Sequence, residues 1–304
     1  MPGVVIITGA SSGFGKCSAE TLAQRGYKVY ATMRDIADRN RIACAALRAE
    51  AKQNEFDLSV LEMDVRSEES ICRTVKEIAS VAGRIDVVVN NAGFGTIGMT
   101  EAYSVQQFQQ VFDTNFFGAV RVNRAVLPIM RRQRSGLLIH VSSPGGRIPV
   151  PFTGAYCASK CALEALADAY CFELRPLGID SVVVEPAFSP TSIQQNSIVP
   201  DDPCRAEEYE IVVECLGRVR RIFNDSVTSP AAIQPEVFAD SIIKLIETPS
   251  GERPFRTLIG QRVEFLKKYN DLAFELRSIC AERLQVRELL QAPRGQKLAA
   301  DASG

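Results

Sequence analysis

Short runs of valine, isoleucine and leucine recur along the chain, and a stretch of helical character follows each of the first six. The runs show no alternation of apolar and polar residues, which is typical of strands buried on both faces of a parallel sheet. We expect strands at residues 4–7, 27–33, 58–64, 85–90, 137–142, 180–185 and 255–259. We expect helices at residues 14–25, 36–53, 68–82, 104–134, 155–176 and 235–247. This alternation predicts an α/β fold in three layers, with helices on both faces of a doubly wound parallel sheet.

No segment of the sequence separates two hydrophobic cores, so residues 1–291 are predicted to form a single domain. Residues 187–234 interrupt the strand–helix pattern with several prolines and a charged helical stretch near 205–223. A connection of this length is typical of a lid or a binding loop, and we expect it to cover the substrate. Residues 261–291 read as a charged amphipathic helical extension, and residues 292–304 as a flexible tail.

Composition excludes several classes of protein. The net charge is -1, from 35 Lys plus Arg against 36 Asp plus Glu, which argues against a nucleic-acid-binding protein. The sequence contains no apolar stretch long enough for a transmembrane segment, and its first residues lack the features of a signal peptide. The nine cysteines show no C-x-x-C spacing, which indicates free thiols in a reducing compartment, so we expect a cytoplasmic protein.

The single histidine, His140, excludes a Ser/His/Asp or Cys/His site and a multi-histidine metal site, and no metal is predicted. His140 lies inside an apolar run and is interpreted as a packed strand residue. Glu164 and Asp168 are interpreted as surface or interface charges of their helix.

A glycine-bearing turn follows the first strand and opens the first helix. Such a turn lets backbone amides approach a pyrophosphate, whose charge is favoured at a helix N-terminus. The alternative interpretation is that these glycines only allow the chain to turn and bind no phosphate, because glycine turns after strands are common. The candidate cofactor-binding residues here are Gly9, Ser11, Ser12, Gly13, Phe14 and Gly15.

The end of the second strand bears on the choice between the two nicotinamide cofactors. Dinucleotide-binding folds that prefer NAD usually carry an acid at this point, to bind the ribose hydroxyls. Met33 occupies that position here and Arg34 follows it, so the guanidinium can pair with a 2′-phosphate. NADP(H) is therefore the expected cofactor. Asp35, one residue further, keeps NAD(H) as an alternative, and a solvated surface arginine is the other reading of Arg34.

A tyrosine and a lysine four residues apart, Tyr156 and Lys160, are predicted to share one face of a helix. An ammonium beside a phenol lowers the pKa of the phenol, which prepares it for proton exchange with an alcohol or a carbonyl. Ser142 and Ser143 end the fifth predicted strand, and the segment 90–93 ends the fourth, so all of these groups converge on one rim of the sheet. A lone pair with this spacing also arises by chance, and the convergence is what strengthens the interpretation.

These motifs together resemble the short-chain dehydrogenase/reductase superfamily, in its form with a single Rossmann-like domain. The residues that carry the resemblance are T-G-A-S-S-G-F-G at 8–15, N-N-A-G at 90–93 and Y-x-x-x-K at 156–160, and it extends over about 3–260. The pattern is similar to that of the hydroxysteroid and retinol dehydrogenase branch.

The resemblance implies roles for single residues. Tyr156 matches the catalytic acid/base, Lys160 the residue that lowers its pKa and binds the nicotinamide ribose, and Ser143 the serine that orients the substrate oxygen. Asn115 matches the helix asparagine that supports a proton-relay water. Further cofactor contacts are implied for Asp64 and Val65 at the adenine, and for Asn91, Ala92, Gly93, Pro186, Phe188 and Thr191. Ala187 stands where the family usually has a glycine.

The resemblance implies an oxidoreductase that transfers a hydride between NADP(H) and an alcohol or carbonyl compound. Phe94, Val150 and Phe152 flank the predicted rim, and their apolar side chains indicate a bulky apolar ketone or secondary alcohol as the small-molecule substrate. Related proteins assemble as dimers or tetramers, so a homo-oligomer is expected. The alternatives are an NAD-dependent alcohol dehydrogenase and a nucleotide-binding regulatory protein without catalytic activity.

Overall fold

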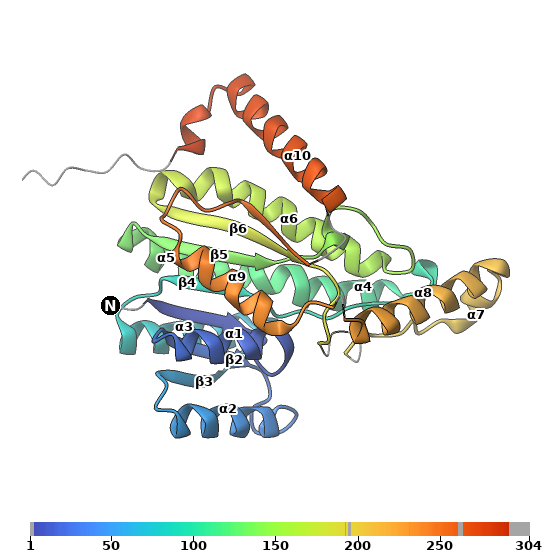
Figure 1. The fold of residues 1–304 in the computed structure, drawn as a ribbon, viewed down its shortest axis with the longest axis horizontal. Coiled ribbons are helices and arrows are strands. Elements are labelled where there is room, and N and C mark those ends of the chain that lie inside the picture. Colours follow the sequence, from blue (N-terminus) through green and yellow to red (C-terminus); the bar gives the residue numbers. More distant parts are fainter. Residues whose placement is uncertain (1–2, 192, 194–195, 231, 261–263, 292–304) are drawn as a thin grey trace, which may run out of the picture.

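A seven-stranded sheet forms the centre of the computed structural model, which describes residues 3–191, 193, 196–230, 232–260 and 264–291 (Figure 1). All neighbouring strands are parallel, and their order is β3-β2-β1-β4-β5-β6-β7. The strands are β1 (Val4–Thr8), β2 (Lys28–Met33), β3 (Leu58–Glu62), β4 (Val87–Asn90), β5 (Gly136–Val141), β6 (Ile179–Pro186) and β7 (Arg256–Ile259). The expected strands and the parallel doubly wound sheet are thereby confirmed.

Helices cover both faces of the sheet. One face packs against α1, α2 and α9, and the other against α3, α5 and α6. The helices are α1 (Gly13–Gln24), α2 (Arg41–Gln53), α3 (Glu68–Ala82), α4 (Val105–Phe112), α5 (Gly118–Gln133), α6 (Gly154–Leu174), α7 (Pro203–Glu207), α8 (Ile211–Thr228), α9 (Pro235–Glu247) and α10 (Glu264–Arg283). These layers form the three-layer, single-domain Rossmann-like architecture that the sequence predicts.

The first strand shows why its apolar run has no polar alternation. Successive side chains of a strand point to opposite faces of the sheet. Val5 and Ile7 join the core on the α1 face, whereas Val4 and Ile6 join the core on the α3 face. All four side chains are buried, so apolar residues are favoured at successive positions on both faces of the sheet.

The chain reverses its direction of winding between β1 and β4. From β1 it continues to β2 and β3 on one side, while β4 to β7 extend on the other side. At such a switch point the carboxyl ends of the two central strands open a crevice for a ligand. Thr8 ends β1 and Asn90 ends β4, so the residues that follow them line this crevice.

Three predicted helices differ from the observed ones. The helix expected at 104–134 is interrupted by a π-helical turn at Asp113–Phe117, between α4 and α5. The charged stretch near 205–223 forms two helices, α7 and α8. The helix expected at 36–53 begins only at Arg41, because Asp35 adopts a left-handed backbone and the Asn40 side chain donates a 2.7 Å hydrogen bond to the Arg34 carbonyl.

The two regions outside the sheet occupy different sides of the molecule. Figure 1 shows α7 and α8 beyond the carboxyl ends of the strands, whereas α10 lies next to α6 at the outer edge. Residues 261–263 of the expected extension, and the whole tail at 292–304, lie outside the described residues. Within the described part of the chain, no helix has the length and apolar character needed to cross a membrane.

Candidate active site

The turn between β1 and α1 depends on glycine. Gly9 and Gly13 have φ angles of 69° and 54°, in the left-handed region that other residues rarely adopt. A Cβ on Gly9 would lie 2.8 Å from the Ala92 Cα, and one on Gly13 would lie 3.1 Å from the Thr191 Cβ. The turn therefore packs closely between the residues after β4 and those after β6. Its backbone precedes the first turn of α1, where unpaired N–H groups favour an anion.

A threonine and an asparagine hold this turn against the end of β4. The backbone amides of Asn91 and Ala92 both donate 3.0 Å hydrogen bonds to Thr8 Oγ1. The Asn91 side chain donates to the carbonyls of Thr8 and Gly9, at 2.9 and 3.1 Å. The N-N-A-G segment thus fixes the shape of the crevice, and the Asn91 amide group is already engaged within the protein.

The Phe14 side chain has a packing role. Its ring stacks on Phe238 of α9, with ring centroids 4.2 Å apart and an angle of 18° between the planes. Only the backbone of Phe14 is then available to a phosphate. Ser11 lies in the turn itself, and Ser12 is the N-cap residue of α1.

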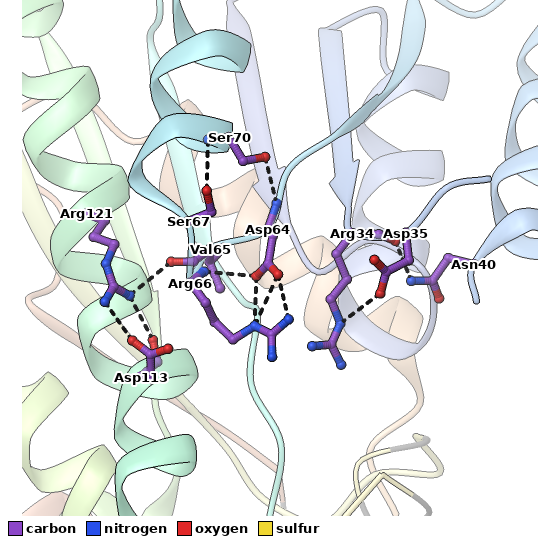
Figure 2. Close-up of polar contacts among 10 residues, drawn as sticks. All are labelled: Arg34, Asp35, Asn40, Asp64, Val65, Arg66, Ser67, Ser70, Asp113 and Arg121. Carbon is purple, nitrogen blue, oxygen red and sulfur yellow. Dashed lines mark hydrogen bonds and ion pairs between the residues drawn. The ribbon is translucent and has the colours of Figure 1, made fainter. Parts of the chain in front are cut away.

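Two arginines meet beyond the ends of β2 and β3 (Figure 2). Figure 2 shows the guanidinium groups of Arg34, which follows β2, and Arg66, which follows β3, next to each other. Burial lowers the pKa of Arg34 from its ordinary value, and repulsion by Arg66 and Arg39 lowers it further. Asp64 and Asp35 oppose this effect, and Asp35 Oδ2 lies 3.8 Å from Arg34 Nε. Cations in such proximity favour the binding of an anion between them.

Asp64 is paired with Arg66 through several hydrogen bonds. The Arg66 guanidinium donates to both carboxylate oxygens, at 2.6 to 3.1 Å, and its backbone amide donates at 2.9 Å. These hydrogen bonds hold the pKa of Asp64 below its ordinary value. Asp64 therefore neutralises Arg66 in part, and the adjoining Val65 is buried against Gly118 at the start of α5.

The glycine turn, the arginine pair and the crevice fit a phosphorylated dinucleotide. The turn offers backbone N–H groups without side chains in front of them, as a pyrophosphate requires. At Arg34 the neighbouring cations Arg66 and Arg39 are opposed by Asp64 and Asp35, and Asp113 also acts on Arg66.

A serine, a tyrosine and a lysine meet where β5 ends and α6 begins. Ser143 follows β5 directly, and its hydroxyl is near enough to the Tyr156 hydroxyl of α6 to act on the pKa of the tyrosine. Lys160 lies one helical turn further along α6, with its Nζ 5.8 Å from the centre of the Tyr156 ring. Ser142, the other candidate serine, is buried. The structure thus brings together Ser143, Tyr156 and Lys160 as the sequence predicts.

Burial dominates the ionisation of this pair. It raises the pKa of Tyr156 to about 12, against the hydrogen bond from Ser143, which lowers it. It also lowers the pKa of Lys160 to about 8, against the nearby negative charge of Glu164. The lowering of the tyrosine pKa that the sequence analysis expects from the lysine is not seen here. Lys160 Nζ instead donates a 2.8 Å hydrogen bond to the Val141 carbonyl. At neutral pH the tyrosine is a protonated phenol.

Asn115 lies in the π-helical turn and is buried. Its side chain accepts a hydrogen bond from the Phe94 amide and donates one to the Phe94 carbonyl, both of 3.0 Å. It also donates to Ser159 Oγ at 3.0 Å, and Ser159 donates in turn to the Tyr156 carbonyl at 2.7 Å. Asn115 therefore connects the segment after β4 with the helix that carries Tyr156 and Lys160.

The segment after β6 links the turn to the expected lid. Pro186 ends β6, and Thr191 lies against the Gly13 backbone. The Phe188 ring, which is 42% exposed, packs on Phe223 of α8 with ring centroids 4.9 Å apart. Ala187, in place of the glycine usual in similar sequences, keeps the β-type pairing of this strand end through a 2.9 Å hydrogen bond to the Ile259 carbonyl.

The three residues expected to contact substrate lie around this rim in different environments. Phe94 and Val150 are partly buried. Phe152, with a φ of 66°, packs in a small apolar cluster with Met99 and with Leu216 of α8. The cluster therefore joins the expected lid to the rim.

The interpretation of Glu164 as a surface or interface charge is wrong, and Asp168 is only partly exposed. Glu164 is buried and pairs with Arg256 of β7 at 3.0 Å, and Asp168 pairs with the same arginine at 2.7 Å. Glu185 of β6 lies in this network, where burial and the adjacent Glu164 raise its pKa to about 7. The periodicity of the sequence did not indicate this ion network, because the partner Arg256 is distant in sequence from Glu164 and Asp168. His140, in contrast, is buried in β5 as expected.

A separate hollow of about 560 Å³ lies at the amino ends of the strands, among residues such as Gly3, Asp86 and Arg253. It is remote from Ser143 and Tyr156 and has no part in the candidate active site. In the described part of the chain, no group of three or more His, Cys, Asp or Glu side chains is arranged to hold a metal ion.

Comparison with known proteins identifies the family. The short chain dehydrogenase family model matches residues 3–200. The chain belongs to this family. Family membership makes the protein an oxidoreductase of the short-chain dehydrogenase type, as the sequence motifs predict.

Individual relatives agree with this assignment. The chain is 32% identical to a 3-ketodihydrosphingosine reductase of Bacteroides thetaiotaomicron, over 87% of this chain and 90% of the relative. It is 32% identical to 17-beta-hydroxysteroid dehydrogenase type 1 of Homo sapiens, over 79% of this chain and 74% of the relative. A crystal structure of a short-chain dehydrogenase from Streptomyces avermitilis superposes with a TM-score of 0.76 at 28% identity, covering 93% of this chain and 97% of that one. The expected similarity to the hydroxysteroid and retinol dehydrogenase branch is confirmed.

Proposed function

We propose that the protein is an NADP(H)-dependent short-chain dehydrogenase that interconverts a bulky apolar ketone and the corresponding secondary alcohol. The observation that carries the proposal is the meeting of Ser143, Tyr156 and Lys160 beside the crevice at the carboxyl ends of β1 and β4. A polar group that donates hydrogen bonds and a titratable phenol at one rim are what carbonyl reduction requires.

When bound in the crevice, NADPH would supply the hydride that reduces the carbonyl carbon. The Ser143 hydroxyl orients the substrate oxygen, and Tyr156 donates its phenolic proton to that oxygen. Because burial raises the pKa of Tyr156, the phenol holds at neutral pH the proton that reduction requires. In the reverse direction Tyr156 receives the proton from the alcohol.

Lys160 and Asn115 support the proton transfer. The ammonium of Lys160 would stabilise negative charge as the phenol gives up its proton, and it would bind the ribose of the cofactor. Its pKa of about 8 means that this charge is lost in alkaline solution. Asn115 keeps the π-helical turn joined to α6 through Ser159, which preserves the path for a relay of protons.

The charge distribution beyond β2 and β3 supports a preference for NADP(H) over NAD(H). A 2′-phosphate beside Arg34 and Arg66 would relieve the repulsion between the arginines, whereas the hydroxyl of NAD(H) would not. Glycine turn residues and Thr191 would hold the pyrophosphate and the nicotinamide end, and Val65 would lie against the adenine.

The apolar residues at the rim support a bulky apolar substrate. Phe94, Val150 and Phe152 line it, and Phe188 connects it to α8. We infer that residues 187–234 act as the substrate lid, because this segment docks on the rim through apolar contacts and through ion pairs such as Arg205–Glu101 at 2.8 Å.

A panel of ketones of increasing size, assayed with NADPH and with NADH, tests the proposal. We expect oxidation of NADPH with bulky apolar ketones, with kcat/KM at least about tenfold higher than with NADH. Higher kcat/KM with NADH would support the NAD-dependent alternative, for which Asp35 is the motivating residue. Tight cofactor binding without turnover across the panel would support the nucleotide-binding regulatory alternative.

A further inference from the structure

The C-terminal helix α10 is attached to the domain by one face. Leu266 and Ala281 are fully buried on this face, and two buried polar residues connect it to the ion network of the domain. Asn270 donates a 2.7 Å hydrogen bond to the Glu185 carboxylate, and Arg277 pairs with Asp168 at 3.3 Å. The orientation of the helix is therefore fixed, and the opposite face points away from the domain.

One side of the helix, next to the attached face, carries an apolar stripe, and its Tyr269 ring also lies 4.5 Å from the Arg147 guanidinium of the domain. Its members share a spacing of four, three, four and three residues, and they are between 44% and 59% exposed. They are Phe265, Tyr269, Leu272, Leu276 and Ile279, which we call the α10 stripe. This spacing is the a and d pattern of a heptad repeat, by which two helices pack side by side along a seam. Figure 1 shows α10 at the outer edge of the molecule, where a second helix can reach it.

We propose that the α10 stripe is an interaction surface for a second copy of this chain, and that the two α10 helices pack antiparallel about a two-fold axis. The antiparallel seam would bring Leu272 against Leu276 of the second copy, and Tyr269 against Ile279 of the second copy. In an interface with two-fold symmetry each contact occurs twice, and the same helix surface is used by both copies.

The charges beside the stripe favour this orientation. Lys268 and Glu282 flank it at heptad positions that meet each other in the antiparallel pair, which gives two ion pairs across the axis. In a parallel pair Lys268 would meet Ala273, and the charges would contribute nothing. The antiparallel pair also brings the two copies of Glu275 together at the axis, which is one repulsive contact.

Other occupants of the stripe are less well matched. The tail at 292–304 contains a single large apolar residue, Leu298, which is too little to cover the stripe. A surface of anionic lipid would select cations around the stripe. Lys268 and Arg283 are instead balanced by Glu275 and Glu282.

The mass of the full-length protein by sedimentation equilibrium tests the surface. We expect Leu272→Glu to raise the dissociation constant of the pair at least tenfold and to halve the observed mass, while circular dichroism stays that of the wild type. Val81→Glu, at a 69% exposed position of α3, is the matched control and should leave the mass unchanged. A separate interface elsewhere on the molecule would leave the twofold drop in mass intact.

A charge exchange tests the antiparallel orientation. Lys268→Glu should weaken the pair, and adding Glu282→Lys to the same chain should restore it, while Glu275→Gln should strengthen it. The proposal is overturned if Leu272→Glu leaves the mass unchanged, or if the double charge exchange fails to restore association. It is also overturned if the wild type is monomeric and sediments with vesicles of phosphatidylcholine and phosphatidylglycerol through the α10 stripe.

Discussion

Single side chains beyond β2 and β3 are expected to decide which cofactor binds. Arg34 follows Met33, which stands where an acid would bind the ribose of NAD, and Arg66 approaches from the next loop. Arg34→Ala should weaken NADPH binding by about ten- to a hundredfold, because a hydrogen bond to a charged group contributes about 1.5–3 kcal/mol. Binding of NADH should change little. Dissociation constants for both cofactors, measured by titration calorimetry, check this.

Arg25→Ala is the control for that substitution. Arg25 is an exposed arginine near the amino ends of the strands, away from the cofactor crevice at their carboxyl ends. It should leave both dissociation constants unchanged. An unaltered NADPH/NADH ratio in Arg34→Ala would make Arg34 a solvated surface charge, and the preference would then need another explanation.

The site residues differ in how far the sequence could reveal them. Tyr156, Lys160 and Ser143 were predictable because helical spacing and the end of a strand bring them to one rim. Arg66 was missed, although a basic residue soon after the third strand was a weak signal for it. Ser159 was missed because its role depends on Asn115, which only the fold brings within 3.0 Å.

At the scale of elements, the apolar runs predicted all the described strands, because a strand buried on both faces leaves a continuous apolar signature. The interruption between α4 and α5 left no such signature. It arises from the hydrogen bonds of Asn115 with Phe94, two residues brought together only after β4 and the helix are in position. Likewise the late start of α2 follows from a local contact of Asn40, which periodicity does not register.

The docking of α8 should control access of large substrates. Leu216 is the buried anchor of this helix, in contact with Met99 and Phe152 at the rim. Leu216→Asp should undock the helix and raise the KM for bulky ketones several-fold more than the KM for a small ketone. Steady-state kinetics on a matched pair of ketones provides the measurement.

Ile211→Asp is the control on the same helix, at a position that is 71% exposed. It should leave both KM values near those of the wild type. Equal increases for small and bulky ketones in Leu216→Asp would show that α8 stabilises the rim without acting as a lid.

Across the whole molecule, one buried ion network connects α6, β6, β7 and α10. Arg256 is its centre, and its side chain is only 6% exposed between Glu164, Asp168 and Glu185. Arg256→Ala should lower the free energy of unfolding by about 3–5 kcal/mol, because buried carboxylates lose their partner. Urea denaturation at two pH values measures this loss.

The pH dependence has a defined sign. The folded-state pKa of Glu185 is already raised, and removal of the arginine raises it further, so the folded state binds protons that the unfolded state releases. Stability is then lost as pH rises through this range, and the effect of Arg256→Ala should be larger at pH 8 than at pH 5. Lys267→Ala, which breaks an exposed pair with Asp271, should cost less than about 1 kcal/mol at either pH. Equal losses for the two variants would show that the network is not a centre of stability.

The turnover of Tyr156→Phe tests the proton transfer by Tyr156 most directly. The ring keeps its packing but loses the proton that passes to the substrate oxygen. We expect kcat for the reduction of the best ketone to fall by about 10²–10⁴-fold, the usual contribution of general acid catalysis, while the dissociation constant for NADPH stays nearly unchanged. Tyr170→Phe, on the same helix, should retain the wild-type rate. Near wild-type turnover in Tyr156→Phe would contradict the mechanism.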